Sequence, residues 1–175
     1  MGAVLHRLLQ TLRFERDAFV WMDLNDRATG DGLLLVVVTQ ILLLLGNGQS
    51  LLGLALGFNQ VIGSLLSAIV FWLVYSGITY AASRYLFSGH LGYATVLRIA
   101  GFAYPTLLLW LFTTRVLPSS GLAAFILGAV WLLAIVAYGV HYVADLPLEK
   151  AAASAILGLV GWVIVAAIFS GGIIF

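Results

Sequence analysis

The sequence contains no cysteine and little charge. Without cysteine among its 175 residues, the chain can form no disulfide, thiolate metal site or cysteine nucleophile. Only 9% of the residues are charged, whereas about a quarter are charged in a typical soluble domain. Eight basic and seven acidic side chains are too few to cover a water-facing globule of this length. The scarcity of charge indicates that lipid surrounds much of the molecule.

Patterns that carry catalytic or nucleic-acid chemistry are also missing. A net charge of +1 offers no clustered basic face of the kind that binds nucleic acid. The sequence has no paired intramembrane carboxylates and no HExxH, GxSxG, P-loop or GxGxxG pattern. Two scattered histidines, His90 and His141, are a weak signal for haem ligation. The sequence therefore predicts a non-enzymatic protein without catalytic residues, metal or cofactor.

Long apolar segments follow one another along the chain. A helix needs about 20 apolar residues to cross a hydrocarbon core about 30 Å thick. Five segments reach or approach this length: 31–46, 60–82, 99–116, 121–143 and 151–175. The sequence predicts an all-α transmembrane bundle of about five spans over residues 31–175. Whether residues 50–58 extend the first span stays open.

The basic residues are divided unequally between the two sides of this predicted bundle. Arg115 alone falls on one side, and seven fall on the other: Arg7, Arg13, Arg16, Arg27, Arg84, Arg98 and Lys150. Basic residues in short loops stay in the cytoplasm. We therefore expect a multi-pass protein of the inner (plasma) membrane, with a cytoplasmic N-terminus and an external C-terminus.

Residues 1–30 form a charged, amphipathic segment ahead of the first span. Within it, apolar side chains recur at helical spacing: Val4, Leu5, Leu8, Leu9 and Leu12. Such a helix is expected to lie along the membrane interface, or to pack on the protein's own cytoplasmic loops. Residues 24–32 contain Asn, Asp and Gly, which are typical of a loop leading into the membrane.

The third span contains the most specific local signal. Pro105 lacks a backbone donor and crowds the carbonyl of Gly101, which predicts a hinge there. Carbonyl groups freed at a hinge cannot face lipid. We expect the second or fourth span to cover them with tyrosine hydroxyls, from Tyr80, Tyr138 and Tyr142. Arg98 is expected at headgroup level beside Tyr93.

Three further residues are structural or interaction candidates. Gln40 lies mid-membrane and is expected to form a hydrogen bond to another helix. His141 and Asp145 stand four residues apart at the inner end of the fourth span, on one helical face, where they can pair. Two interpretations of that pair stay open: a proton or ligand site, and an interfacial capping pair.

Residues 88–109, SGHLGYATVLRIAGFAYPTLLL, resemble the bacterial branch of the Yip (Ypt-interacting protein) domain family. Residues 14–38, FERDAFVWMDLNDRATGDGLLLVVV, and Trp131 are similar to the same family. The resemblance implies about five spans, a cytoplasmic N-terminal segment, and a short amphipathic helix, here 92–98, before a proline-containing third span. Eukaryotic members are implicated in Rab-dependent traffic and membrane shaping. Their acidic-aromatic DLYGP-type segment is absent here, so Rab binding is not carried over.

Three functions agree with these features of the sequence. The first is a non-enzymatic protein that acts through contacts with membrane lipids or with other integral membrane proteins. The second is an accessory or assembly subunit of a larger respiratory or photosynthetic membrane complex. The third is a small transporter or channel, in which Gln40, Tyr75, Tyr104 and the Pro105 kink would line a path. We expect the first.

Overall fold

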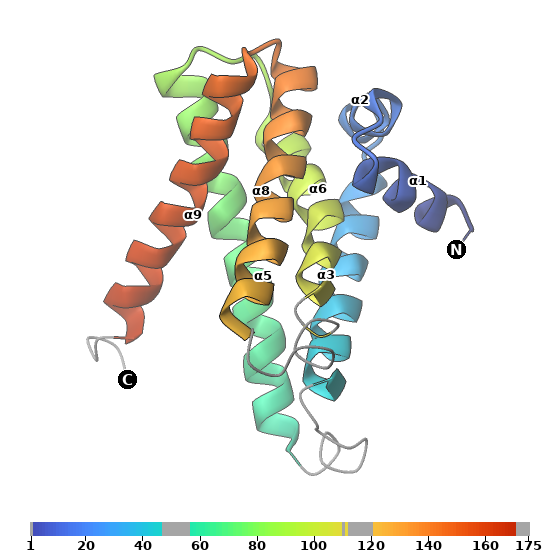
Figure 1. Ribbon diagram of the computed structural model, residues 1–175, viewed down its shortest axis with the longest axis vertical. Helices are drawn as coiled ribbons and strands as arrows, with labels where there is room; N and C mark the ends of the chain where they lie inside the picture. Colours follow the sequence, from blue (N-terminus) through green and yellow to red (C-terminus); the bar gives the residue numbers. More distant parts are fainter. Residues whose placement is uncertain (1, 47–56, 110, 112–120, 171–175) are drawn as a thin grey trace.

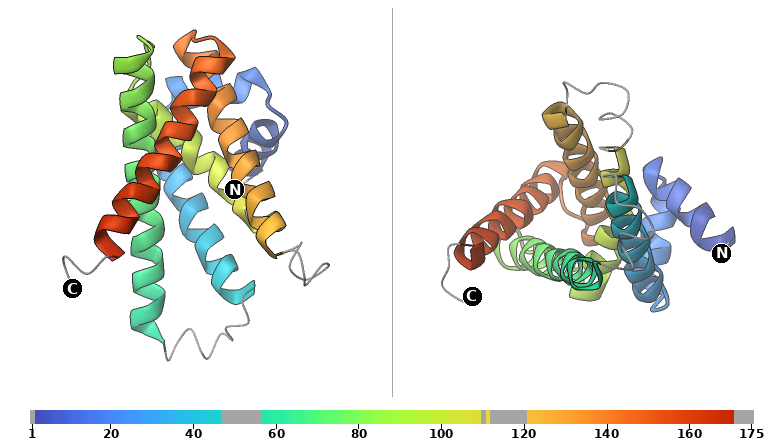
Figure 2. Two further views of the ribbon diagram at one scale, coloured as in Figure 1. Left: turned by 60° about the vertical axis from the view of Figure 1, so that its left-hand side comes forward. Right: turned by 90° about the horizontal axis from the view of Figure 1, so that it is seen from below.

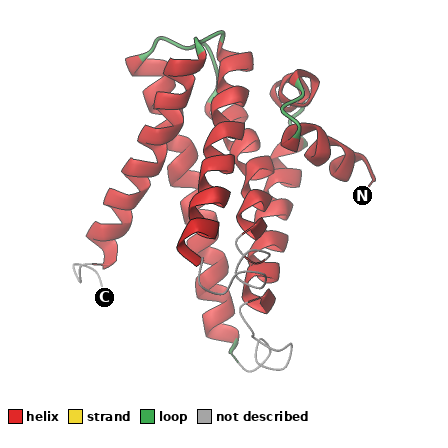
Figure 3. Cartoon of the chain, viewed as in Figure 1, coloured by secondary structure: helices red, strands yellow, loops and turns green. Residues whose placement is uncertain are grey.

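The computed structural model describes residues 2–46, 57–109, 111 and 121–170. Within these ranges every regular element is a helix (Figures 1 and 3). The α-helices are α1 (Gly2–Leu12), α2 (Arg16–Leu24), α3 (Ala28–Gly46), α5 (Phe58–Ala81), α6 (Tyr93–Ala103), α8 (Gly121–Ala144) and α9 (Leu148–Ser170). A π-helical turn, η1 (Ala82–Leu86), follows α5, and a 3-10 helix, η2 (Tyr104–Leu108), follows α6. The predicted all-α bundle is confirmed.

Four described segments are long and apolar enough to cross a membrane: Ala28–Gly46, Phe58–Leu86, Ile126–Ala144 and Leu148–Phe169. They coincide with the predicted first, second, fourth and fifth spans. The predicted third span, 99–116, contains the end of α6 and all of η2. It then enters residues 110 and 112–120, which lie outside the described ranges, as do residues 50–56.

The N-terminal helices are connected more tightly than the sequence predicted. The loop expected over residues 24–32 is wrong in extent, because α2 continues to Leu24 and α3 begins at Ala28. Between them the Asn25 side chain accepts a hydrogen bond from the Arg27 N–H at 3.1 Å, as Asn does in tight turns. Asp31 lies in the first turn of α3, where the helix dipole favours a negative charge. These polar residues therefore begin the helix.

Helix α6 lies at the centre of the bundle. Every residue from Thr95 to Ala103 is buried. It packs against α3, α5 and α8, while α9 packs against α5 and α8 (Figure 2). Gly158 of α9 lies directly against Thr79 of α5, since small residues let membrane helices approach closely. The core is thus built around the segment that carries the predicted hinge.

The polar connections gather at one end of the bundle. Arg16 of α2 borders a shallow cleft together with Leu146 and Pro147 of the α8–α9 turn. The connection after η1 reaches the same place, because Gly89 packs against Leu146. Figure 1 shows these connections together at the upper end of the molecule. The three segments predicted to share one side of the membrane therefore lie at one end.

Helix α1 divides its apolar side chains between two environments. Val4, Leu8 and Leu12 pack against the core, whereas Leu5 and Leu9 are 59% and 49% exposed. One side of α1 therefore packs on the protein itself, while its contact with the membrane interface stays a prediction. The exposed part is free to contact lipid.

Candidate functional site

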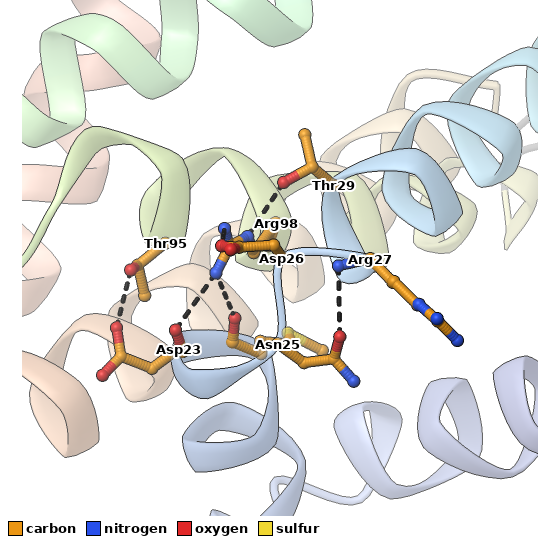
Figure 4. A network of polar contacts seen from close by, with 8 residues as sticks. Asp23, Asn25, Asp26, Arg27, Thr29, Thr95 and Arg98 are labelled. Carbon is orange, nitrogen blue, oxygen red and sulfur yellow. Dashed lines mark hydrogen bonds and ion pairs between the residues drawn. The ribbon is translucent and has the colours of Figure 1, made fainter.

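Arg98 of α6 is buried at the polar end of the bundle, with 5% of its surface exposed. Its Nη1 donates to the carbonyl oxygens of Met22 and Asp23, at 2.9 and 3.1 Å. Its Nε donates to Thr29 Oγ1 at 2.9 Å, and its Nη2 pairs with the Asp26 carboxylate at 2.6 Å. Figure 4 shows the guanidinium among these acceptors. We call these five residues the Arg98 cluster, which joins α6 to both helices flanking the α2–α3 turn.

The chemistry of arginine suits this position. The last carbonyl groups of a helix have no intrahelical donor, and Met22 and Asp23 belong to the last turn of α2. A guanidinium presents five N–H groups in a rigid plane and can serve several acceptors at once. A buried acceptor that loses its donor costs about 1–3 kcal/mol. The Asp26 side chain is 100% exposed, so the backbone acceptors, rather than the ion pair, account for most of the stabilisation.

A second hydrogen bond supports the same contact between α2 and α6. Thr95, one helical turn before Arg98, donates to the Asp23 carboxylate at 2.7 Å. Thr95 is buried and Asp23 is exposed. The N-terminal segment is therefore attached to the centre of the bundle by two polar residues of one helix face.

The surroundings of Arg98 differ from the sequence prediction. An amphipathic helix over residues 92–98 was expected to place Arg98 and Tyr93 along the headgroup region. Instead, α6 continues without a break to Ala103, and α2 and the α2–α3 turn cover Arg98. Tyr93 turns toward α5 and donates to the carbonyl of Leu73 at 3.3 Å. The sequence predicted that Arg98 would contact lipid headgroups. In the structure it instead forms hydrogen bonds with backbone carbonyl groups of the protein.

Gly101 and Pro105 mark two different features of the same segment. Gly101 lies against Gly32 of α3, and a Cβ built on Gly101 would come within 2.8 Å of the Gly32 Cα. The α-helical pattern ends at Ala103, and Pro105 occupies the first turn of the 3-10 helix η2. The hydrogen-bonding pattern therefore changes at the position where the sequence predicted a hinge.

The hydrogen bonds near this change of pattern do not involve the tyrosines that were predicted to cover it. Thr106 Oγ1 lies 2.8 Å from the Ala103 carbonyl oxygen and 3.3 Å from that of Gly128 in α8, and donates to them. Trp72 of α5 donates through its indole N–H to the Leu97 carbonyl at 2.7 Å. Among the described residues, the tyrosine hydroxyls expected in this role form no such bond. The second span therefore contributes one donor near this segment, the Trp72 indole, whereas Gly128 of the fourth span contributes only an acceptor for Thr106.

Gln40 forms the cross-helix hydrogen bonds that its sequence position predicted. Its Nε2 donates to Ser64 Oγ of α5 at 2.6 Å, and its Oε1 accepts from the Tyr104 hydroxyl at 3.2 Å. These three residues border a cavity of about 470 Å³ inside the bundle. Of the residues proposed for a transport path, Gln40 and Tyr104 line this cavity, whereas Tyr75 is fully buried and does not.

His141 and Asp145 do not pair. The Nδ1 of His141 lies 2.5 Å from the carbonyl oxygen of Leu146, and only a protonated nitrogen can donate to that oxygen. Asp145 is exposed and has a left-handed backbone, with φ of 53°, which ends α8 just before Pro147. Helices commonly end in this way. In the described residues no group of three or more His, Asp or Glu side chains could hold a metal ion.

Seven side chains in these polar contacts were not predicted from the sequence: Asp23, Asp26, Thr29, Ser64, Trp72, Thr95 and Thr106. The sequence contained one usable signal for this site. Asp23 and Asp26 stand immediately before the first span, where their carboxylates can accept hydrogen bonds from a buried cation. The indole and the threonine hydroxyl gave no signal, because both residue types are common in membrane helices for other reasons.

The fold and these contacts define a multi-pass, all-helical membrane protein whose polar end is closed by a buried arginine. The model of the Yip1 domain family matches residues 9–172, so the chain belongs to the Yip1 domain family. No curated protein and no solved structure matches the chain. The two segments that carry the resemblance, 14–38 and 88–109, meet at the Arg98 cluster and at the contact of Gly32 with Gly101.

Proposed function

We propose that the protein acts without catalysis, through contacts with lipids and other integral membrane proteins. The observation that supports this is the distribution of side chains on the bundle. Large apolar side chains are exposed along the spans, among them Leu34 of α3, Leu66 of α5, Val130 of α8 and Val163 of α9. Helices α1 and α2 are the only described helices besides the bundle. Within the part of the chain that the structure describes, these apolar surfaces and the N-terminal pair are therefore the main surfaces for contact with a partner.

We also propose the inner (plasma) membrane as the location, with the polar end in the cytoplasm. The connections at that end contain most of the basic residues, and basic residues in short loops are retained on the cytoplasmic side. Arg84 of η1 and Lys150 in the first turn of α9, both exposed, lie beside these connections. The N-terminus would then be cytoplasmic and the C-terminus external.

Purification from native membranes tests the proposed function. The tagged chain would be extracted in a mild detergent, and mass spectrometry would identify the proteins and lipids that stay bound. We expect a defined set that differs from the set bound by an unrelated tagged membrane protein of similar size. Recovery of bulk lipids in bulk proportions, with no membrane protein, would contradict the proposal. Stoichiometric migration with one large complex would identify an accessory subunit.

A further inference from the structure

The cavity bordered by Gln40, Ser64 and Tyr104 has the dimensions of a ligand site. Its volume is about 470 Å³, and ligand pockets in proteins measure about 300–1,000 Å³. Residues of α3, α5, η2, α8 and α9 line it, so it lies within the bundle. Ser67 of α5 and Val163 of α9 line it and are exposed. A molecule in the surrounding bilayer can therefore reach this site between α5 and α9.

The depth of the cavity places it in the hydrocarbon region. Gln40 stands 12 residues after Ala28, the first residue of α3, and six before Gly46. At 1.5 Å per residue, Gln40 lies about 18 Å along α3 from the polar end of the bundle. At this depth the cavity borders the hydrocarbon chains of the bilayer rather than bulk water.

The lining excludes a charged occupant. Most of it is apolar or aromatic, including Phe71, Leu132, Leu159 and Trp162, and none of the lining residues that the structure describes carries a charge. A phosphate or carboxylate in such surroundings would have no cationic partner, and an unpaired charge at low dielectric is strongly disfavoured. The occupant is therefore neutral and largely apolar.

One edge of the cavity retains hydrogen-bonding capacity. Gln40 Nε2 carries two N–H groups, and its bond to Ser64 uses one of them. The Tyr104 hydroxyl donates to Gln40 Oε1, which leaves the oxygen of Tyr104 able to accept. This edge therefore offers both a donor and an acceptor to one small polar group. A hydroxyl group, which donates and accepts, complements both.

We infer that this cavity binds a neutral membrane lipid whose head is a hydroxyl group and whose tail is a single hydrocarbon chain. The hydroxyl group bonds to Gln40 and Tyr104, and the chain lies along Phe71, Leu159 and Trp162. The inference rests on the proposed function, since it names the lipid class and the place of contact.

Quenching of Trp162 fluorescence by a brominated chain tests the inference. The full-length protein would be reconstituted in nanodiscs of phosphatidylcholine and titrated with dibrominated stearyl alcohol. We expect saturable quenching that unlabelled stearyl alcohol reverses and that Trp162→Phe abolishes. Gln40→Leu should weaken apparent binding about tenfold, because it removes both amide groups. Equal quenching by dibrominated stearate or by dibrominated phosphatidylcholine would overturn the inference.

A pair of substitutions on α5 separates loss of the cavity from loss of folding. Ser67→Phe places a ring in the cavity, whereas Val70→Phe adds a ring of the same size at an exposed position of α5 outside the lining. The first should abolish saturable quenching and the second should preserve it, with equal thermal midpoints in both. Preserved quenching in Ser67→Phe would overturn the inference. Native membrane partners that still co-purify with Ser67→Phe would leave the proposed function standing.

Discussion

Gly32 of α3 and Gly101 of α6 meet backbone to backbone, but the two positions are not equivalent. A Cβ built on Gly101 would lie 2.8 Å from the Gly32 Cα and 3.1 Å from its carbonyl carbon. A Cβ built on Gly32 would meet nothing closer than 3.5 Å, at the Gly101 Cα. The approach of α3 to α6 therefore depends on Gly101 in particular.

This asymmetry predicts the effects of two alanine substitutions. Gly101→Ala should destabilise the protein by about 1–3 kcal/mol, because an added methyl group in a packed contact forces backbone movement. Gly32→Ala should have a small effect, since its Cβ has ordinary van der Waals space. Thermal unfolding of both variants in the same detergent provides the measurement. Equal midpoints for the two variants would contradict the observed contact.

Substitution of Arg98 should release the N-terminal segment. Arg98→Leu leaves the carbonyl groups of Met22 and Asp23 without their donor, at about 1–3 kcal/mol for each acceptor that stays buried. Trypsin should then cleave faster at Arg13 and Arg16, which can be followed on a gel. Asp26→Asn is the control, because the Asp26 side chain is fully exposed and its loss should change cleavage little. Unchanged cleavage in Arg98→Leu would show that other contacts hold α2.

Thr106 and Pro105 permit a test of the change from α-helix to 3-10 helix between α6 and η2. Thr106→Val removes the hydroxyl group that reaches Ala103 and Gly128 and should lower the thermal midpoint. Thr106→Ser keeps the hydroxyl group and should leave the thermal midpoint close to that of the unmodified protein. Pro105→Ala restores a backbone donor to Gly101, so hydrogen exchange of amides in residues 100–109 should slow. Membrane insertion should stay unchanged in Pro105→Ala. Loss of the protein from the membrane fraction, with no change in exchange, would argue against a local break.

Reporter fusions test the proposed orientation. A reporter active only in the cytoplasm should work at Met1, within residues 88–92 and near Pro147. A reporter active only outside should work within residues 47–50, near Ser119 and after Phe175. Cytoplasmic activity at the C-terminus would mean that the number of spans is even, contrary to the five predicted.

The exposed side chains of α1 should enter the lipid. Because the chain has no cysteine, single cysteines at positions 5, 9 and 13 can be labelled with a nitroxide. Labels at 5 and 9 should be more accessible to oxygen, which concentrates in lipid, than the label at 13, where Arg13 is exposed beside a turn. Leu8→Ser should lower the thermal midpoint, since Leu8 packs on the core. Equal accessibility at all three labels would place α1 away from the membrane.

The sequence alone determined the class of the protein and the approximate spans. Charge content and apolar length are local properties. They indicate which solvent surrounds a segment, whichever helices pack against it. Four predicted spans correspond to described helices. The prediction of a hinge at Pro105 also rests on local chemistry, because proline lacks its N–H wherever the helix is placed.

Only the tertiary structure decided what these polar residues contact. Arg98 reaches Met22, 76 positions earlier in the chain, and Gln40 reaches Tyr104, 64 positions later. Helical periodicity assigns a side chain to a face, but the partner depends on which helices pack together and at what height. The position of Arg98 near the end of a span agrees equally well with a contact to lipid headgroups. Only the packing of α2 over Arg98 decides that its partners are protein groups. The hydrogen-bond partners of Arg98 are therefore determined by the packing of α2 against α6, and not by the residues within either helix.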